Sequence, residues 1–466
     1  MTKGKGEEQK IVAAHIGVVA ERPAVHNLEI DDDASGLVAG GDLNLGNAVS
    51  CYSYCLQMKD VPRANCAPPS ARLPLLSDGY KKGSVMTSAS RIESLPTPSL
   101  ILDESRMMKN ISRLRQHAQK LGVQLRPHLK TPKSVEVARR LLVNGNGPST
   151  VSTLREAEEF FAAGVKDILY AVGISPDKLE RVAALRRKGC DLTIVLDSPS
   201  QARAVADVSR KADDRIPVLI EIDCDGHRSG FAPNDPGLVE VGRILREEGA
   251  ELRGVLTHAG ESYGVTGEDA LAAFAERERL AAVTAAETLR MAGLPSPVVS
   301  VGATPTAHFA RDLTGVTELR AGVFVFFDLV MAGIHVCSID DIALSVLTTV
   351  IGHQRERGWI MIDAGWMALS RDRGTANQAV DQGYGIVCDI EGKPFPNLIV
   401  KAANQEHGIV AQRAGSGEHL PQLPVGTKLR ILPNHACATG AQFDGYEVLP
   451  VDASAPLVHW ARFRGW

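Results

Sequence analysis

Short apolar runs alternate with longer amphipathic segments from residue 97 to about residue 335. The longer segments repeat apolar residues every three or four positions, which indicates helices, whereas the short runs indicate buried strands. In the first predicted helix, Met107, Ile111, Leu114 and Ala118 share one face, and Asp103 precedes it as a cap. The strands expected after this helix are 123–125, 150–152, 168–171, 192–196, 218–222, 252–256, 298–301 and 316–319. Eight strands alternating with helices predict a (β/α)8 barrel over residues 95–335, not an open sheet.

The pattern changes after residue 340, where short apolar or alternating runs are separated by Gly and Pro. The expected strands are 343–351, 359–362, 386–390, 398–402, 408–412, 428–432 and 446–449. They predict a C-terminal all-β domain over residues 340–466. A further short strand, 98–102, precedes the first helix, and we note that this segment could also pack on the β domain.

Residues 1–85 differ from the rest because acidic, Gly-rich and Pro-rich pieces follow one another without a sustained period. We predict a poorly ordered extension here. Met86 stands just before the first well-patterned segment, and we hypothesise that the native chain starts there. Cys51, Cys55 and Cys66 have no matching second pair, so a metal site in this region is not favoured.

The composition limits the classes of function that the protein is expected to have. The 466 residues are 44% hydrophobic and 23% charged, as in an ordinary globular enzyme, and a net charge of -4 favours neither nucleic acid nor an anionic membrane as partner. No apolar run approaches the roughly 20 residues needed to span a bilayer, and no secretory signal is visible. The 8 cysteines are scattered, which favours a reducing compartment. We therefore expect a cytoplasmic enzyme with a small-molecule substrate.

Lys130 follows the first predicted barrel strand, amid Arg126, His128 and Lys133. Pro127 cannot lie in the middle of a sheet, so Lys130 is expected just past a strand end, where barrel enzymes carry their chemistry. Nearby cations and partial burial favour the neutral amine, which can form a Schiff base with an aldehyde. The alternative is a solvated basic turn.

Three later strand ends also carry candidate groups. Arg228 lies in a Gly-flanked turn after the fifth strand, and His258 and Tyr263 follow the sixth. After the seventh, the small, hydroxyl-rich stretch 302–306 opens a helix, where backbone N–H groups and a Thr hydroxyl suit a phosphate. The alternative for Arg228 is a solvated arginine, and for His258 and Tyr263 it is rings with structural partners. The alternative for 302–306 is an ordinary capped turn.

His435 and Cys437 form a second notable element after the run 428–432. If this segment is extended, the two side chains project from one face of a strand. Imidazole and thiolate are zinc-type ligands. Two protein ligands leave open positions, which suits a catalytic metal more than a structural one, although a His-x-Cys pair is commonly incidental.

Two long motifs resemble one known family. The stretch 126–134 (Arg-Pro-His-Leu-Lys-Thr-Pro-Lys-Ser) resembles the cofactor-lysine motif of the D-threonine aldolase / D-serine dehydratase family, and 433–439 (Pro-Asn-His-Ala-Cys-Ala-Thr) resembles its metal motif. Stretches 302–306, 363–365 and 381–385 also resemble segments of this family. The resemblance covers roughly residues 95–466. Pro132 departs from the pattern, because the family more often has His there.

The resemblance implies pyridoxal-phosphate enzymes of the alanine-racemase-like fold, a barrel followed by a β domain, commonly assembled as homodimers. Carried over to this chain, Lys130 would hold the cofactor as a Schiff base. The turn Gly302, Ala303 and Thr304 would hold the phosphate. The remaining cofactor-binding residues would be Arg228, His258 and Tyr263, and the zinc ligands would be His435 and Cys437.

A cysteine at the second ligand position resembles the dehydratase branch. The expected reaction removes water from a D-β-hydroxy amino acid and yields a 2-oxo acid and ammonia, with Lys130 taking the α-proton. D-serine, D-threonine and D-threo-3-hydroxyaspartate all stay open as substrates, and Arg371 and Arg373 could bind a second carboxylate unless they lie in a solvated loop. The alternatives are a metal-dependent aldolase that gives glycine and an aldehyde, and a non-catalytic pyridoxal-phosphate carrier.

Overall fold

Eight parallel strands form a barrel in the part of the chain that the structure, a computed structural model, describes: residues 88–226 and 228–466. Their order is β2-β9-β8-β7-β6-β5-β4-β3, and a parallel bridge between His128 and Thr150 joins the two end strands. The strands are β2 (Gln124–Pro127), β3 (Ser149–Val151), β4 (Asp167–Gly173), β5 (Asp191–Leu196), β6 (Pro217–Ile222), β7 (Glu251–Thr257), β8 (Val298–Val301) and β9 (Glu318–Ala321). The predicted barrel is confirmed. The expectations about residues 1–85 lie outside the described residues.

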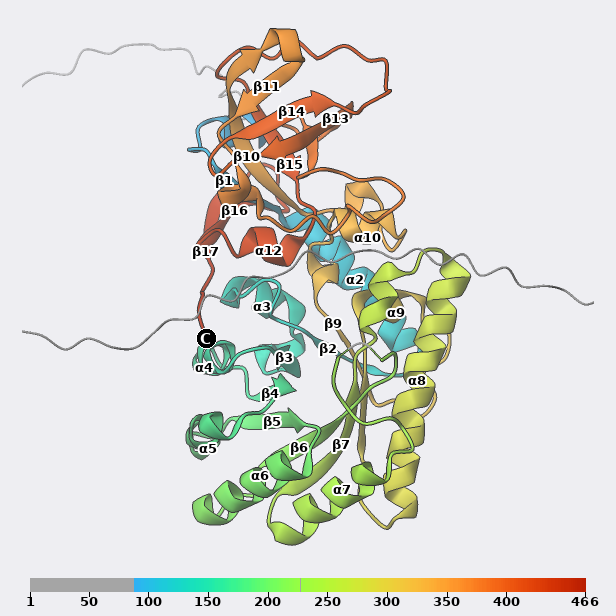
Figure 1. Ribbon diagram of the computed structural model, residues 1–466. Helices are drawn as coiled ribbons and strands as arrows, with labels where there is room; N and C mark the ends of the chain where they lie inside the picture. The colour runs from blue at the N-terminus through green and yellow to red at the C-terminus, as the bar shows by residue number, and fades with distance from the viewer. Residues whose placement is uncertain (1–87, 227) are drawn as a thin grey trace, which may run out of the picture. The chain divides into compact units, whose positions relative to one another are not determined.

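Helices cover the outside of the strands that they follow, as Figure 1 shows for α4 to α8. β6 is buried at all 6 positions, because a parallel strand is covered on both faces. The helices next to the barrel are α2 (Glu104–Lys120), α3 (Val135–Leu141), α4 (Leu154–Ala162), α5 (Leu179–Arg187), α6 (Pro199–Ala212), α7 (Pro236–Glu248), α8 (Glu268–Met291) and α9 (Thr304–Phe309). The predicted cap of α2 is present, because Asp103 Oδ1 accepts a hydrogen bond from Arg106 N at 3.0 Å.

The second sheet has nine strands in the order β11-β14-β13-β12-β15-β10-β1-β16-β17, with an extra β10–β11 pairing that closes six of them into a ring. The strands are β1 (Ser99–Asp103), β10 (Leu344–Gln354), β11 (Trp359–Ile362), β12 (Ile386–Cys388), β13 (Pro394–Ala403), β14 (Gly408–Gln412), β15 (Lys428–Leu432), β16 (Gly445–Leu449) and β17 (Val458–Ala461). Short helices accompany them: α1 (Ser88–Glu93), α10 (Leu329–Gly333), α11 (Trp366–Leu369) and α12 (Ala436–Gly440). β1 pairs with β10 and β16, so the first strand belongs to this sheet.

Two strands differ from the sequence expectation. β9 lies two residues later than predicted, because Glu318 and Arg320 are charged residues buried inside the barrel and interrupt the apolar run. β17 was not predicted, because only one of its four residues is buried and the strand lies at the sheet edge. Among the described residues, no helix combines the length and the apolar character that crossing a membrane requires.

Candidate active site

Lys130 lies just beyond the carboxyl end of β2, in a loop fixed by backbone hydrogen bonds. Leu129 N donates to Thr150 O at 2.8 Å, and Lys133 N donates to Leu129 O at 3.0 Å. The position past the strand end is as predicted. The side chain is exposed, not partly buried as expected, because it lines the cavities described below.

An inner cavity of about 250 Å³ opens at the carboxyl ends of the barrel strands. Its lining brings together every residue predicted to bind the cofactor or the metal, from both domains: Lys130, Arg228, His258, Tyr263, Gly302, Ala303, Thr304, His435 and Cys437. Residues more than 300 positions apart along the chain therefore face one space. His128 and Arg320 also line it and were not predicted as site residues.

The turn from Gly302 to Thr304 forms one wall of this cavity. Gly302 adopts φ 145°, and a Cβ atom built there would lie 1.8 Å from Arg320 O, so only glycine fits. The Thr304 side chain is fully buried, and among the described residues only the Tyr263 phenol lies near its Oγ1, without the geometry of a proper hydrogen bond. A buried hydroxyl without a partner is costly, so this wall suits a ligand oxygen such as that of a phosphate.

Two histidines in the cavity are held neutral. His258 Nδ1 is 2.8 Å from Gly302 O, and burial lowers the pKa of His258 to about 3. Burial, together with the Lys130 charge, also places the pKa of His128 well below its usual value. The two rings can therefore line a cofactor site without adding charge.

Tyr263 lies in the 3-10 helix Gly260–Gly264, with its ring centroid 6.4 Å from that of His258. Burial raises the pKa of the Tyr263 phenol, which stays protonated. Arg228 is paired with Glu221 at 3.4 Å, and its side chain is 55% exposed. Both residues line the cavity as candidates, Tyr263 as a buried phenol and Arg228 as a half-exposed cation.

Arg320 is the buried cation of the inner cavity. Its Nη1 donates to Ser300 Oγ at 2.6 Å, its Nη2 donates to Thr257 O at 2.5 Å, and the residue is 4% exposed. Burial lowers the pKa of its guanidinium to about 10, so Arg320 keeps its charge. Two charged residues in and beside the predicted strand 316–319, Glu318 and Arg320, were the signal that could have identified it.

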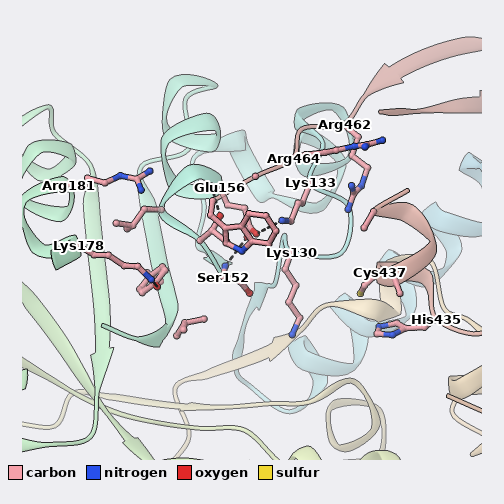
Figure 2. Close-up of a pocket in the computed structure, with 18 residues that line it drawn as sticks. Lys130, Lys133, Ser152, Glu156, Lys178, Arg181, His435, Cys437, Arg462 and Arg464 are labelled. Carbon is pink, nitrogen blue, oxygen red and sulfur yellow. Dashed lines mark hydrogen bonds and ion pairs between the residues drawn. The ribbon is translucent and has the colours of Figure 1, made fainter. Parts of the chain in front are cut away.

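His435 and Cys437 do not lie on a strand, and that part of the prediction was wrong. β15 ends at Leu432, Pro433 follows, and His435 is the N-terminal cap of the helix α12, which contains Cys437. The two side chains still meet, because a residue at the cap and one in the first turn can face the same side. Figure 2 shows Lys130, His435 and Cys437 around one opening.

Asp372 contacts the His435 ring nitrogen that faces away from Cys437, and the sequence analysis did not predict it. Asp372 Oδ2 lies 2.6 Å from His435 Nδ1, which leaves Nε2 for Cys437 or a metal. Burial lowers the pKa of His435, but Asp372 and Cys437 outweigh it and raise that pKa to about 11. Burial likewise opposes the Cys437 thiolate, yet His435 and Lys130 bring the pKa of the thiol below its usual value. Without a metal the two groups therefore form an imidazolium–thiolate pair, and a cation bound by both would take the place of the proton on His435 Nε2.

The donor set fits zinc with open coordination positions, since it offers one imidazole nitrogen and one thiolate. Within residues 88–226 and 228–466, no cluster of three or more His, Cys, Asp and Glu side chains has the arrangement of a metal site. The pair therefore lacks the four protein ligands of a structural zinc site.

The β domain also fixes the loop that carries Lys130. Cys437 Sγ lies 3.2 Å from Thr131 Oγ1, Tyr446 Oη donates to Pro132 O at 2.7 Å, and Phe463 N donates to Lys133 O at 2.9 Å. Pro132, where the family more often has His, contributes its carbonyl to this contact. The loop of Lys130 and the His435–Cys437 pair are consequently held by one set of interdomain hydrogen bonds.

An outer cleft of about 790 Å³ continues from Lys130, His435 and Cys437 toward the C-terminal residues (Figure 2). Arg371 and Arg373 are not among its lining residues. Arg373 pairs with Asp381 at 2.6 Å, and Arg371 lies 4.4 Å above the Trp366 ring. Both arginines lie outside helices and strands and Arg371 is exposed, which supports the alternative of a solvated loop.

The barrel matches the model of the alanine racemase N-terminal domain over residues 102–330, and the β domain matches the putative serine dehydratase domain over residues 343–449. The fold and these two matches thus define a pyridoxal-phosphate-dependent lyase of the alanine-racemase-like class.

The chain is 55% identical to D-threo-3-hydroxyaspartate dehydratase of Delftia sp. (strain HT23) over 376 residues, which are 80% of this chain and 98% of that protein. It is 28% identical to D-serine dehydratase of Dictyostelium discoideum, covering 79% and 98% of the two chains. This chain belongs to the D-threonine aldolase / D-serine dehydratase family. Aldolases of the family are also similar, among them D-threonine aldolase of Arthrobacter sp., at 29% identity over 76% of this chain and 89% of that protein.

A solved structure of the Delftia sp. HT23 dehydratase matches with a TM-score of 0.78 and 54% identity, covering 82% of this chain and 100% of that one. A variant of a D-threo-3-hydroxyaspartate dehydratase in which a cysteine is replaced by alanine is a metal-free form, with the same identity, coverage and TM-score.

Proposed function

We propose that this protein is a pyridoxal-phosphate- and zinc-dependent dehydratase of D-β-hydroxy amino acids, which releases a 2-oxo acid and ammonia. The observation that carries the proposal is the pair His435 and Cys437 beside Lys130, at the junction of the inner cavity and the outer cleft. Similarity to the Delftia enzyme favours D-threo-3-hydroxyaspartate over D-serine and D-threonine as substrate.

Lys130 Nζ would bind the cofactor, the Gly302–Thr304 turn would hold its phosphate, and His435 Nε2 with Cys437 Sγ would hold zinc. When bound, pyridoxal phosphate would stabilise negative charge at the α-carbon, and zinc would polarise the β-hydroxyl as a Lewis acid. Lys130 Nζ, once released, accepts the α-proton. Asp372 fixes the His435 tautomer, and Thr131 fixes the Cys437 thiol through their 3.2 Å contact.

The aldolase reaction is the second candidate, because it uses the same cofactor site and D-threonine aldolases are similar to this chain. The Cys437 ligand favours the dehydratase, since a soft thiolate suits zinc whereas a carboxylate suits harder cations such as manganese. A non-catalytic pyridoxal-phosphate carrier would leave the His435–Cys437 pair without a role.

The test is incubation of the protein, loaded with cofactor and zinc, with D-serine, D-threonine and D-threo-3-hydroxyaspartate, while ammonia and glycine are both assayed. Ammonia and 2-oxo acid that disappear on chelation and return with zinc would support the dehydratase. Glycine with an aldehyde would establish the aldolase, and neither product would favour the carrier.

Two variants separate the roles. We expect Lys130→Ala to lose the absorbance of the bound cofactor and all turnover. We expect His435→Ala to keep the absorbance and lose elimination, so unchanged turnover in His435→Ala would refute the metal role. A homodimer and a cytoplasmic location stay predictions, the first of which light scattering tests.

A further inference from the structure

Arg462 is a buried arginine on the metal side of the outer cleft. It directly follows β17 and is only 7% exposed, yet it lines the same cleft as Lys130, His435 and Cys437. A Cβ atom built at Gly440, one turn after Cys437 in α12, would lie 3.6 Å from Arg462 Nε. The guanidinium therefore packs on the helix that carries the metal cysteine.

No carboxylate neutralises this guanidinium within residues 88–226 and 228–466, where no Asp or Glu oxygen lies within 4.0 Å of it. Its side-chain partner is the neutral phenol of Tyr446, and its buried Nε has no hydrogen-bond acceptor in the described structure. Burying a charge without a counter-charge costs several kcal/mol. Such a side chain is expected where an anion from outside completes the pair.

The other cations of the cleft do not share this property. Lys130 is exposed, and the remaining ones have partners. Lys133 pairs with Glu156 at 3.1 Å, Arg181 with Glu158 at 3.0 Å and Arg464 with Asp444 at 2.9 Å. Lys178 has no carboxylate among the described residues, but it is half-buried and donates to Tyr170 Oη at 3.3 Å. Arg462 is thus the cation whose burial and lack of a counter-charge together call for an anionic ligand.

The position of Arg462 indicates which anion it receives. The inner cavity, where the cofactor would lie, is lined by Lys130, His435 and Cys437 but not by Arg462, whereas the outer cleft is lined by all four. Relative to the cofactor cavity, Arg462 therefore lies beyond the metal pair. A substituent on the β-carbon of a substrate held beside His435 and Cys437 would enter this space, while the α-carboxylate, one carbon closer to Lys130, would stay in the inner cavity.

We propose that Arg462 is the specificity residue that binds the β-carboxylate of a D-3-hydroxydicarboxylic amino acid, an inference that rests on the proposed dehydratase function. A planar guanidinium can bind a carboxylate through two parallel hydrogen bonds. D-serine carries only hydrogen at that position and leaves Arg462 unpaired, so the site discriminates in favour of the dicarboxylate.

The experiment compares wild type, Arg462→Gln and Arg462→Lys in kcat/KM for D-threo-3-hydroxyaspartate and for D-serine. We expect Arg462→Gln to lower kcat/KM for the dicarboxylate roughly 10- to 100-fold, as for a lost hydrogen bond to a charged group, and to change D-serine turnover less than about 3-fold. Arg462→Lys keeps a point charge and should recover part of the loss. Arg464→Gln is the matched control, because Arg464 lies on the rim of the same cleft and already has Asp444.

A binding measurement without turnover complements the kinetics. D-aspartate has the β-carboxylate but no β-hydroxyl, and D-alanine has neither, so both can be titrated against the absorbance of the bound cofactor. We expect Arg462→Gln to weaken D-aspartate binding and leave D-alanine binding unchanged, with the unfolding temperature and cofactor absorbance as folding controls.

The outcomes are distinguishable. An equal loss for both substrates in Arg462→Gln and Arg462→Lys would overturn the proposal, because Arg462 would then be structural or bind the α-carboxylate. Wild-type turnover of D-serine without turnover of the dicarboxylate would also overturn it, while leaving the dehydratase intact. If wild type dehydrates neither substrate, the proposed function itself fails, and with it the role of Arg462 in substrate choice.

Discussion

Replacing Asp372 by Asn tests whether the carboxylate behind His435 sets the affinity for zinc. The change keeps an oxygen that can accept from His435 Nδ1 and removes the negative charge at 2.6 Å. The imidazole therefore loses the partner that orients its ring and strengthens Nε2 as a donor. We expect zinc to bind more weakly, and Asp372→Ala to be weaker still, because the ring is then free to rotate.

The structure sets the magnitude. A hydrogen bond to a charged group contributes about 1.5 to 3 kcal/mol when buried. Here the side chains of His435 and Asp372 are 39% and 36% exposed, so solvent screening reduces the contribution to the lower end. About 1.5 kcal/mol corresponds to roughly a 10-fold loss of zinc affinity, the lower end of the 10- to 100-fold range for such outer partners.

The assay is competition for zinc between metal-free protein and a chromophoric chelator at a fixed pH near 7.5, which does not depend on turnover. Glu447→Gln is the matched control, because Glu447 pairs with His459 at the same kind of distance, 2.7 Å, on β16 and β17. Zinc affinity of Asp372→Asn within 2-fold of wild type, or an equal loss in Glu447→Gln, would refute the reasoning.

Three further predictions concern the cofactor turn, acid stability and the interdomain contact. Thr304→Val should weaken pyridoxal phosphate binding about 10-fold, because the unpartnered hydroxyl is lost as a donor; an absorbance titration showing wild-type affinity would contradict it. Burial lowers the pKa of His308 to about 3, so below pH 6.5 the unfolded chain takes up a proton that the folded protein does not, and stability falls as the pH falls toward 3. His308→Gln should therefore lose about 1.6 kcal/mol less than wild type between pH 6.5 and 5 in urea unfolding, and parallel losses would contradict this. Tyr446→Phe removes the 2.7 Å bond to Pro132 O and should lower the free energy of unfolding by about 1 to 2 kcal/mol, which unchanged urea midpoints would exclude.

The sequence determined most of the barrel because its strands are buried on both faces and its helices on one. Those two environments produce continuous apolar runs and a 3.6-residue period, which are local signals. Lys130 could be placed at a strand end for the same reason, since Pro127 limits where β2 can continue. β17 was not predicted, because an edge strand with one buried residue has no such pattern.

Tertiary structure decided which side chains surround Lys130, His435 and Cys437. Asp372 and His435 are 63 residues apart, and Arg462 reaches the cleft only because β17 pairs with β16 at the sheet edge. Neither contact has a local signal, because an isolated Asp or Arg in a polar segment has the same pattern whether it is solvated or buried against a partner. The residue types beside Lys130 were thus encoded locally, but the orientation of His435 and Cys437 and the counter-charges of the cleft follow from the packing of two domains against one loop.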